Sequence, residues 1–134
     1  MLKKRLIALA LAAAIVCLAF AGMAFATKAP KAPKLCNEPR VEPNKIVIAC
    51  ADFGLVVEKI NWRYWGPDKA KGSGVLSDSS GGNYLVNVTL QKVRSRNCDG
   101  YHGKIFKTMK LNFPGALPPY AASVQKNRLF CVSK

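Results

Sequence analysis

Apolar and polar residues alternate along much of the chain after residue 44, with a period of two. The clearest case is NYLVNVTL, residues 83 to 90, where one set of alternate positions is Tyr84, Val86, Val88 and Leu90 and the other contains Leu85, Asn87 and Thr89. Because successive side chains of a strand point to opposite faces, this segment predicts a strand with one core face and one largely wet face.

Two further segments predict strands. KIVIACA, residues 45 to 51, is a short β-branched run after the turn-forming Glu42-Pro43-Asn44, which is typical of a strand buried on both faces. KIFKTMKLNF, residues 104 to 113, predicts a strand with its lysines at exposed positions.

LVVEKINWRYW, residues 55 to 65, fits a strand better than a helix. Its content is β-branched and aromatic, and Gly54 and Gly66 bound it. Strict alternation would put Trp62 and Trp65, three positions apart, on opposite faces. We therefore expect one tryptophan in the core and the other as a candidate surface aromatic.

Turn-forming residues separate these segments. GPDKAKGSG, residues 66 to 74, and SDSSGGN, residues 77 to 83, concentrate the Gly, Asp, Ser and Asn that hairpins use. Residues 27 to 134 contain no long run with a period of 3.6. Several short strands at this spacing predict an all-β fold, a small sandwich or barrel of antiparallel strands.

Residues 1 to 26 resemble a targeting segment. Lys3, Lys4 and Arg5 precede an apolar run that ends in Ala24-Phe25-Ala26, which is typical of a cleavable secretory signal. An uncleaved anchor is the alternative, because about 20 apolar residues span a bilayer. No later segment is apolar enough to cross a membrane.

We expect a secreted protein, or one at the exterior of the cell envelope. Its expected organisation is a solvated Lys/Pro-rich spacer at residues 27–35 followed by a single monomeric β domain at 36–134.

Four cysteines follow the signal: Cys36, Cys50, Cys98 and Cys131. In an exported chain an even number of cysteines predicts two disulfides, and four cysteines allow three connectivities. Pairing between nearest neighbours, Cys36 with Cys50 and Cys98 with Cys131, is favoured. A metal site is disfavoured because the chain has no Cys-x-x-Cys and only one histidine, His102. We expect neither a metal nor a cofactor.

The segment from VEPNKIVIACADFG to GPDKAKGSGVL, residues 41 to 76, resembles the central part of a family of small secreted proteins known mainly from actinobacteria. The matching positions are Cys50, Ala51, Asp52, Gly54, Trp62, Trp65, Gly66, Ala70, Gly72 and Gly74, and residues 86 to 90 resemble that family's next strand. The resemblance implies a secreted β domain and no particular chemistry. Family members often carry another cysteine pair where this chain has SDSSGG, so their disulfide pairing does not transfer.

Charge is the strongest functional signal. The chain has a formal net charge of +14, and residues 92 to 134 carry nine Lys and Arg against Asp99 alone. Such a distribution favours an anionic polymer, lipid headgroups or an acidic protein as partner. The candidate binding surface is Trp62, Trp65, Lys92, Arg94, Arg96, Lys104, Lys107 and Lys110, with Lys92, Arg94 and Arg96 on one strand face. The lysines would also serve solubility and protect sheet edges.

These features predict a non-enzymatic binding domain. The alternative is a small ribonuclease-like hydrolase with Glu58 as base, His102 as acid and Arg63 on the phosphate, although any chain of this composition contains such a trio. A third hypothesis is an enzyme inhibitor that uses FPGALPPY, residues 113 to 120, whose prolines pre-order a loop.

Overall fold

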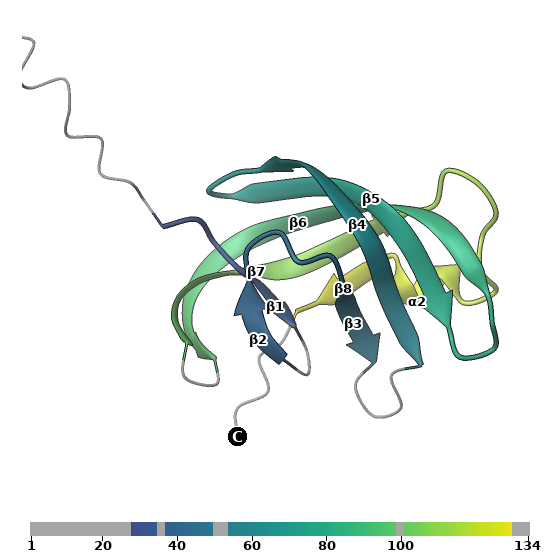
Figure 1. The fold of residues 1–134 in the computed structure, drawn as a ribbon, viewed down its shortest axis with the longest axis horizontal. Coiled ribbons are helices and arrows are strands. Elements are labelled where there is room, and N and C mark those ends of the chain that lie inside the picture. The colour runs from purple at the N-terminus through teal and green to yellow at the C-terminus, as the bar shows by residue number, and fades with distance from the viewer. Residues whose placement is uncertain (1–27, 35–36, 50–53, 99–100, 130–134) are drawn as a thin grey trace, which may run out of the picture.

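A computed structural model describes residues 28–34, 37–49, 54–98 and 101–129, and these form an antiparallel β structure. A small hairpin pairs β1 (Ala32–Lys34) with β2 (Asn37–Arg40). Six strands then follow each other in sequence order: β3 (Ile46–Ala49), β4 (Leu55–Trp65), β5 (Lys69–Asp78), β6 (Asn83–Cys98), β7 (Tyr101–Asn112) and β8 (Lys126–Arg128). This sheet curls into a nearly closed barrel with one short helix, α2 (Ala121–Val124), beside it (Figure 1). The predicted all-β fold is confirmed, and the architecture is a barrel.

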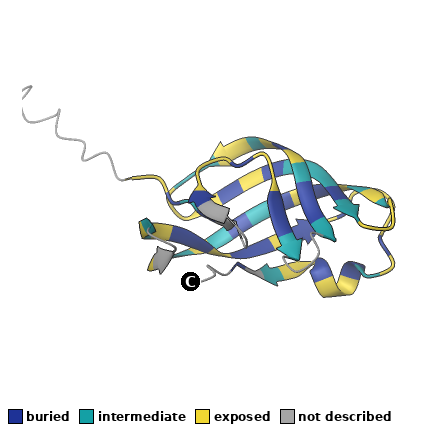
Figure 2. Ribbon diagram, turned by 60° about the horizontal axis from the view of Figure 1, so that its bottom comes forward, coloured by how far each residue is buried: buried dark blue, intermediate teal, exposed yellow. Residues whose placement is uncertain are grey.

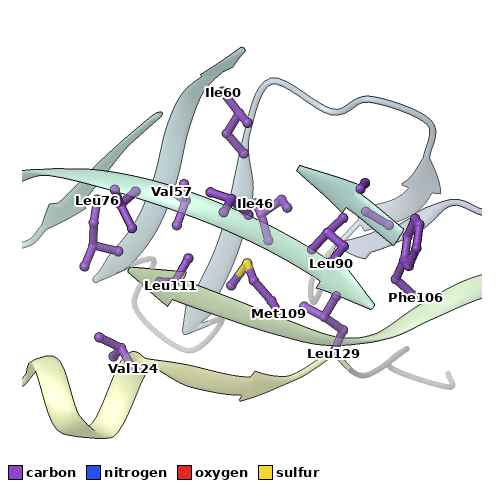
Figure 3. Packing of buried hydrophobic residues seen from close by; sticks show 14 of the residues in the cluster. Ile46, Val57, Ile60, Leu76, Leu90, Phe106, Met109, Leu111, Val124 and Leu129 are labelled. Carbon is purple, nitrogen blue, oxygen red and sulfur yellow. The ribbon is translucent and has the colours of Figure 1, made fainter. Parts of the chain in front are cut away.

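The barrel interior holds the hydrophobic core. Figure 3 shows side chains from successive strands meeting there, among them Val57, Leu76, Leu90, Met109 and Leu129. The alternation predicted for residues 83 to 90 is confirmed, because the Val86, Val88 and Leu90 side chains are buried while Leu85 and Asn87 are exposed. Figure 2 shows this alternation of buried and exposed positions along the long strands.

A bend in the β6–β7 ladder changes which residues face the core. Leu90 pairs with Met109, and Val93 pairs with Phe106; all four side chains belong to the core cluster or pack against it. Leu90 and Val93 are three positions apart along β6, and strict alternation would put them on opposite faces of the sheet. The strands turn at Lys92, whose backbone φ is +59°. Lys92 and Lys107 lie between the paired residues Gln91–Thr108 and Val93–Phe106, and both side chains are exposed.

β4 contains two bulges relative to β5. The pairing shifts by one residue between Glu58 and Asn61, and again between Trp62 and Tyr64. Lys59, in the first bulge, has a φ of +53°, a conformation that a bulge uses and that non-glycine residues adopt at some cost. Each inserted residue reverses the faces of all the residues that follow it.

The turn predicted over residues 66 to 74 is mostly wrong, because β5 begins at Lys69. Only residues 66 to 68 connect the strands. Gly72 lies opposite Trp62, and a Cβ on Gly72 would come within 2.9 Å of the indole ring and 2.7 Å of the Asn61 backbone oxygen. Gly74 likewise lies against β4, where a Cβ would approach the Glu58 oxygen to 2.8 Å. These glycines make room for large side chains of the neighbouring strand.

The N-terminal segment is part of the fold. Pro30 and Ala32 are fully buried, and the Lys31 N–H and C=O bond the backbone of Lys104 and Phe106, each at 3.0 Å. β1 and β2 also contact β7. The expectation of a solvated spacer at residues 27–35 is therefore wrong for residues 30 to 32, because Lys31 bonds the backbone of β7 and its two neighbours are buried. Lys28 and Ala29 are exposed, as expected for a spacer.

The tight turn predicted at SDSSGGN is confirmed between β5 and β6. One carboxylate oxygen of Asp78 accepts hydrogen bonds from the Ser80 N–H, Ser80 hydroxyl and Gly82 N–H at 2.6 to 3.0 Å, and the other accepts the Tyr120 hydroxyl at 2.6 Å. These donors, Ser80 first, lower the pKa of Asp78 to about 2. Burial and the Asp78 bond raise the pKa of Tyr120 well above its usual value. The bond ties the segment before α2 to this turn.

Cys36, Cys50 and Cys131 lie outside the described residues, and of Cys98 only the backbone is described. The two predicted disulfides therefore stay a prediction, as does the signal at residues 1 to 26, which lies outside the described part as well. Within the described ranges, no helix has the length and apolar content that crossing a membrane requires.

Candidate functional site

The two tryptophans lie together, so the prediction that they point to opposite sides is wrong. Their ring centroids are 4.8 Å apart in an edge-to-face arrangement, and Trp65 makes a second such contact with Phe106 at 5.4 Å. The bulge between Trp62 and Tyr64 is the physical reason, because the inserted residue returns Trp65 to the face of Trp62. Alternation alone could not reveal it.

Both indoles donate hydrogen bonds to backbone carbonyls of segments that precede β3. Trp62 Nε1 donates to the carbonyl oxygen of Pro43 at 2.8 Å, and Trp65 Nε1 donates to that of Pro30 at 2.9 Å. The aromatic residue of β4 that is exposed is Tyr64, at 51%. The tryptophans therefore serve mainly as anchors, with only part of their surface open to a ligand.

The basic residues form a ribbon made of β6 and β7, the two longest strands, which contain no Asp or Glu. Five of the six cations there are exposed, and Arg94 is half-buried; they are Lys92, Arg94, Arg96, Lys104, Lys107 and Lys110. We call these six residues the basic ribbon. The Arg94 Nε is buried without a hydrogen-bond partner within the described residues.

The basic ribbon presents charge on both of its faces. Arg94 and Arg96 lie opposite Ile105 and Gly103, whereas Lys104 lies opposite Ser95 and so points to the other face. A partner that contacts many of these cations must therefore wrap around the ribbon or follow its edge.

A hollow of about 200 Å³ lies where the basic ribbon meets the N-terminal segment. It is lined by Lys28, Ala29, Pro30, Trp65, Gly66, Pro67 and Lys104. Lys31 lies nearby in sequence, with its Nζ 4.2 Å from the centre of the Tyr101 ring, a cation–π distance. Trp65 and Lys104, two of the predicted surface residues, thus meet in one recess with a second lysine. We call it the lysine hollow.

The structure does not bring the hydrolase trio together. Glu58 shares a cross-strand row with Val75 and Leu85, and its carboxylate accepts the Ser77 hydroxyl at 3.0 Å. His102 pairs with Asn97, twelve residues beyond Leu85 along β6. Arg63 is exposed in the second bulge of β4. Within the described residues, no group of three His, Cys, Asp or Glu is placed to hold a metal ion.

The proline-containing loop of residues 113 to 120 is held at both ends. Phe113 and Pro118 are buried, and Tyr120 bonds Asp78. Leu117, between these anchors, is 63% exposed. The loop therefore connects β7 to α2 and exposes four apolar residues between Phe113 and Tyr120: Pro114, Ala116, Leu117 and Pro119. The inhibitor hypothesis stays a prediction.

A second hollow, of about 380 Å³, was missed by the sequence analysis. It lies on the outer face of β4, β5 and β6 and is lined by Lys59, Asn61, Ser73, Gly74, Val75, Leu85, Val86, Asn87 and Pro114. We call it the amide hollow. Asparagine is depleted in strands, so Asn61 within β4 and Asn87 within β6 are a signal that could have indicated it.

The chain matches no protein-family model, no curated protein and no solved structure.

Proposed function

We propose that the protein is an exported, non-enzymatic binding domain that engages an anionic polymer at or outside the cell envelope through the basic ribbon. The observation that carries the proposal is the charge of β6 and β7, which together hold six Lys and Arg and no carboxylate. A surface of one sign attracts polyanions and raises their association rate.

The bend at Lys92 supports this assignment. Lys92 and Lys107 both lie between the paired residues Gln91–Thr108 and Val93–Phe106, and like charges close together on neighbouring strands destabilise a sheet. Lys92 also adopts a positive φ, which costs free energy for a residue with a side chain. An anionic group bound at this bend would offset the repulsion between the two lysines.

The lysine hollow provides a recess at the end of the same ribbon. Lys28, before β1, and Lys104, in β7, both line it, so they would approach one anionic group from different parts of the chain. Trp65 forms part of its wall, and its fluorescence would report binding there. The basic ribbon would supply attraction along a polymer, and the hollow would hold one of its charged groups.

The test is binding of labelled poly-L-glutamate and of long-chain polyphosphate across a salt series. We expect binding at low salt that weakens as the Debye length falls from about 10 Å to about 3 Å. A Lys92→Gln, Lys107→Gln double variant should bind several-fold more weakly. The matched control is Lys45→Gln with Arg63→Gln, which removes the same charge from exposed positions outside the ribbon and should change affinity much less.

Equal losses in the two double variants would show that only net charge matters and would overturn the ribbon as a site. No binding to either polyanion at low salt would also overturn the proposal. Hydrolysis of RNA by the protein that disappears in His102→Ala would favour the hydrolase alternative instead.

A further inference from the structure

We propose that the amide hollow binds an uncharged, linear, β-linked polysaccharide laid across strands β4, β5 and β6. This inference does not rest on the proposed function, because the amide hollow and the basic ribbon share no residue. Their ligands also differ in charge, so the two interactions respond differently to salt.

A continuous row of polar side chains crosses the outer face of the sheet at this hollow. Asn61 pairs with Ser73, Ser73 with Asn87 and Asn87 with Asn112, one residue from each of β4 to β7. Neighbouring strands lie about 4.8 Å apart. The row therefore offers one amide or hydroxyl group about every 5 Å, close to the length of one pyranose ring in an extended chain.

The chemistry of the lining matches that of a sugar ring. Asn and Ser side chains both donate and accept hydrogen bonds, as adjacent sugar hydroxyls do. Asn61, Ser73 and Asn87 make no side-chain hydrogen bond with the described residues, and the two asparagines are exposed. Their polar groups are thus available to a ligand.

Apolar atoms lie beside these polar groups. Leu85 is 65% exposed, and it lines the hollow together with Val75 and Pro114. Pyranose rings present a C–H face as well as hydroxyls, so a lining with both kinds of group suits them. Binding sites generally combine an apolar lining with a few placed polar groups in this way.

The backbone at the hollow is specialised. The first β4 bulge lies here, and Lys59 within it adopts a φ of +53°. Gly74 forms part of the lining and packs so closely on β4 that a Cβ would meet the Glu58 oxygen at 2.8 Å. Strained backbone that the surrounding structure maintains is typical of functional sites.

Charge favours a neutral glycan over an acidic one. Lys59 is the one ionisable side chain among the residues that line the hollow. An acidic polysaccharide would need a cation for most of its rings, whereas this row supplies amides and a hydroxyl. The volume of about 380 Å³ is at the lower end for a ligand site and suits a short stretch of a chain that continues beyond both ends.

The test is affinity electrophoresis of the purified protein in native gels, with hydroxyethyl cellulose, glycol chitin or polygalacturonate in the gel. We expect retardation by at least one of the two uncharged polymers, and the retardation should persist in high salt. An Asn61→Ala, Asn87→Ala double variant should lose at least tenfold in affinity. Asn44→Ala is the control, because it removes an exposed amide outside the hollow that, like those of Asn61 and Asn87, makes no side-chain hydrogen bond with the described residues.

A cooperative unfolding transition at the wild-type temperature would confirm that the double variant is folded. Retardation by polygalacturonate alone, or retardation equal in the wild type and the double variant, would overturn the proposal. Absence of retardation in every gel would overturn it too. Binding of unfolded carboxymethylated casein that the double variant loses would assign the hollow to an extended peptide instead.

Discussion

Replacing Gly72 by alanine tests whether the small residues of β5 are required by the tryptophans. The new Cβ would lie 2.7 Å from the Asn61 backbone oxygen and 2.9 Å from the Trp62 ring. Because the first of these atoms belongs to the backbone, β4 itself must move. Overpacking of this kind costs about 1 to 3 kcal/mol, more than the roughly 0.5 to 1 kcal/mol that alanine gains over glycine within a strand.

The assay is urea unfolding followed by tryptophan fluorescence. We expect a lower midpoint for Gly72→Ala with an unchanged m value, and a thermal midpoint lower by about 4 to 8 °C for each kcal/mol lost. Gly115→Ala is the control, since no atom lies within 4 Å of its added Cβ, and it should be neutral or stabilising by up to about 1 kcal/mol. Equal stability of Gly72→Ala and the wild type would refute the packing explanation.

Two further perturbations test how peripheral segments are attached to the barrel. Trp65→Phe removes the indole N–H that binds the Pro30 carbonyl. We expect the free energy of unfolding to fall by about 1 to 3 kcal/mol and hydrogen exchange at the Lys31 amide to become faster. Unchanged exchange there would contradict the anchoring role. The pKa of Asp78 is lowered from 3.8 to about 2. The stability that the ionised Asp78 carboxylate contributes is therefore present above pH 3.8 and is lost as the pH falls toward 2. The raised pKa of Tyr120 gives the opposite dependence, with stability present below its ordinary value of 10.0 and lost as the pH rises above it. Tyr120→Phe should therefore weaken both the acid and the alkaline dependence of the thermal midpoint, and a wild-type profile in that variant would contradict the assignment.

Local sequence determined much of the β-sheet. Residues 83 to 90 form a regular strand because one face contacts the core along its whole length, and a period of two then appears directly in the sequence. The turn at residues 79 to 82 follows from Asp78 and the glycines after it, whose hydrogen bonds are local. The basic ribbon could also be found from sequence, since its cations lie on two consecutive strands without carboxylates.

The β4 bulges and their consequences could not be predicted. Whether Gly72 marks a turn or makes room for a tryptophan depends on the residue opposite it, and that pairing is a property of the sheet register. A single inserted residue then moves Trp65 to the face of Trp62.

The amide hollow required the same long-range information. Its row joins Asn61, Ser73 and Asn87 from three strands, and nothing in the local sequence of any one strand indicates the others. The N-terminal segment looks solvated in sequence because it is rich in lysine and proline, yet Pro30 is buried where it meets Trp65. The sequence by itself determined the strands and the charge; the tertiary structure decided which side chains meet, because contacts between strands depend on register and bulges rather than on composition.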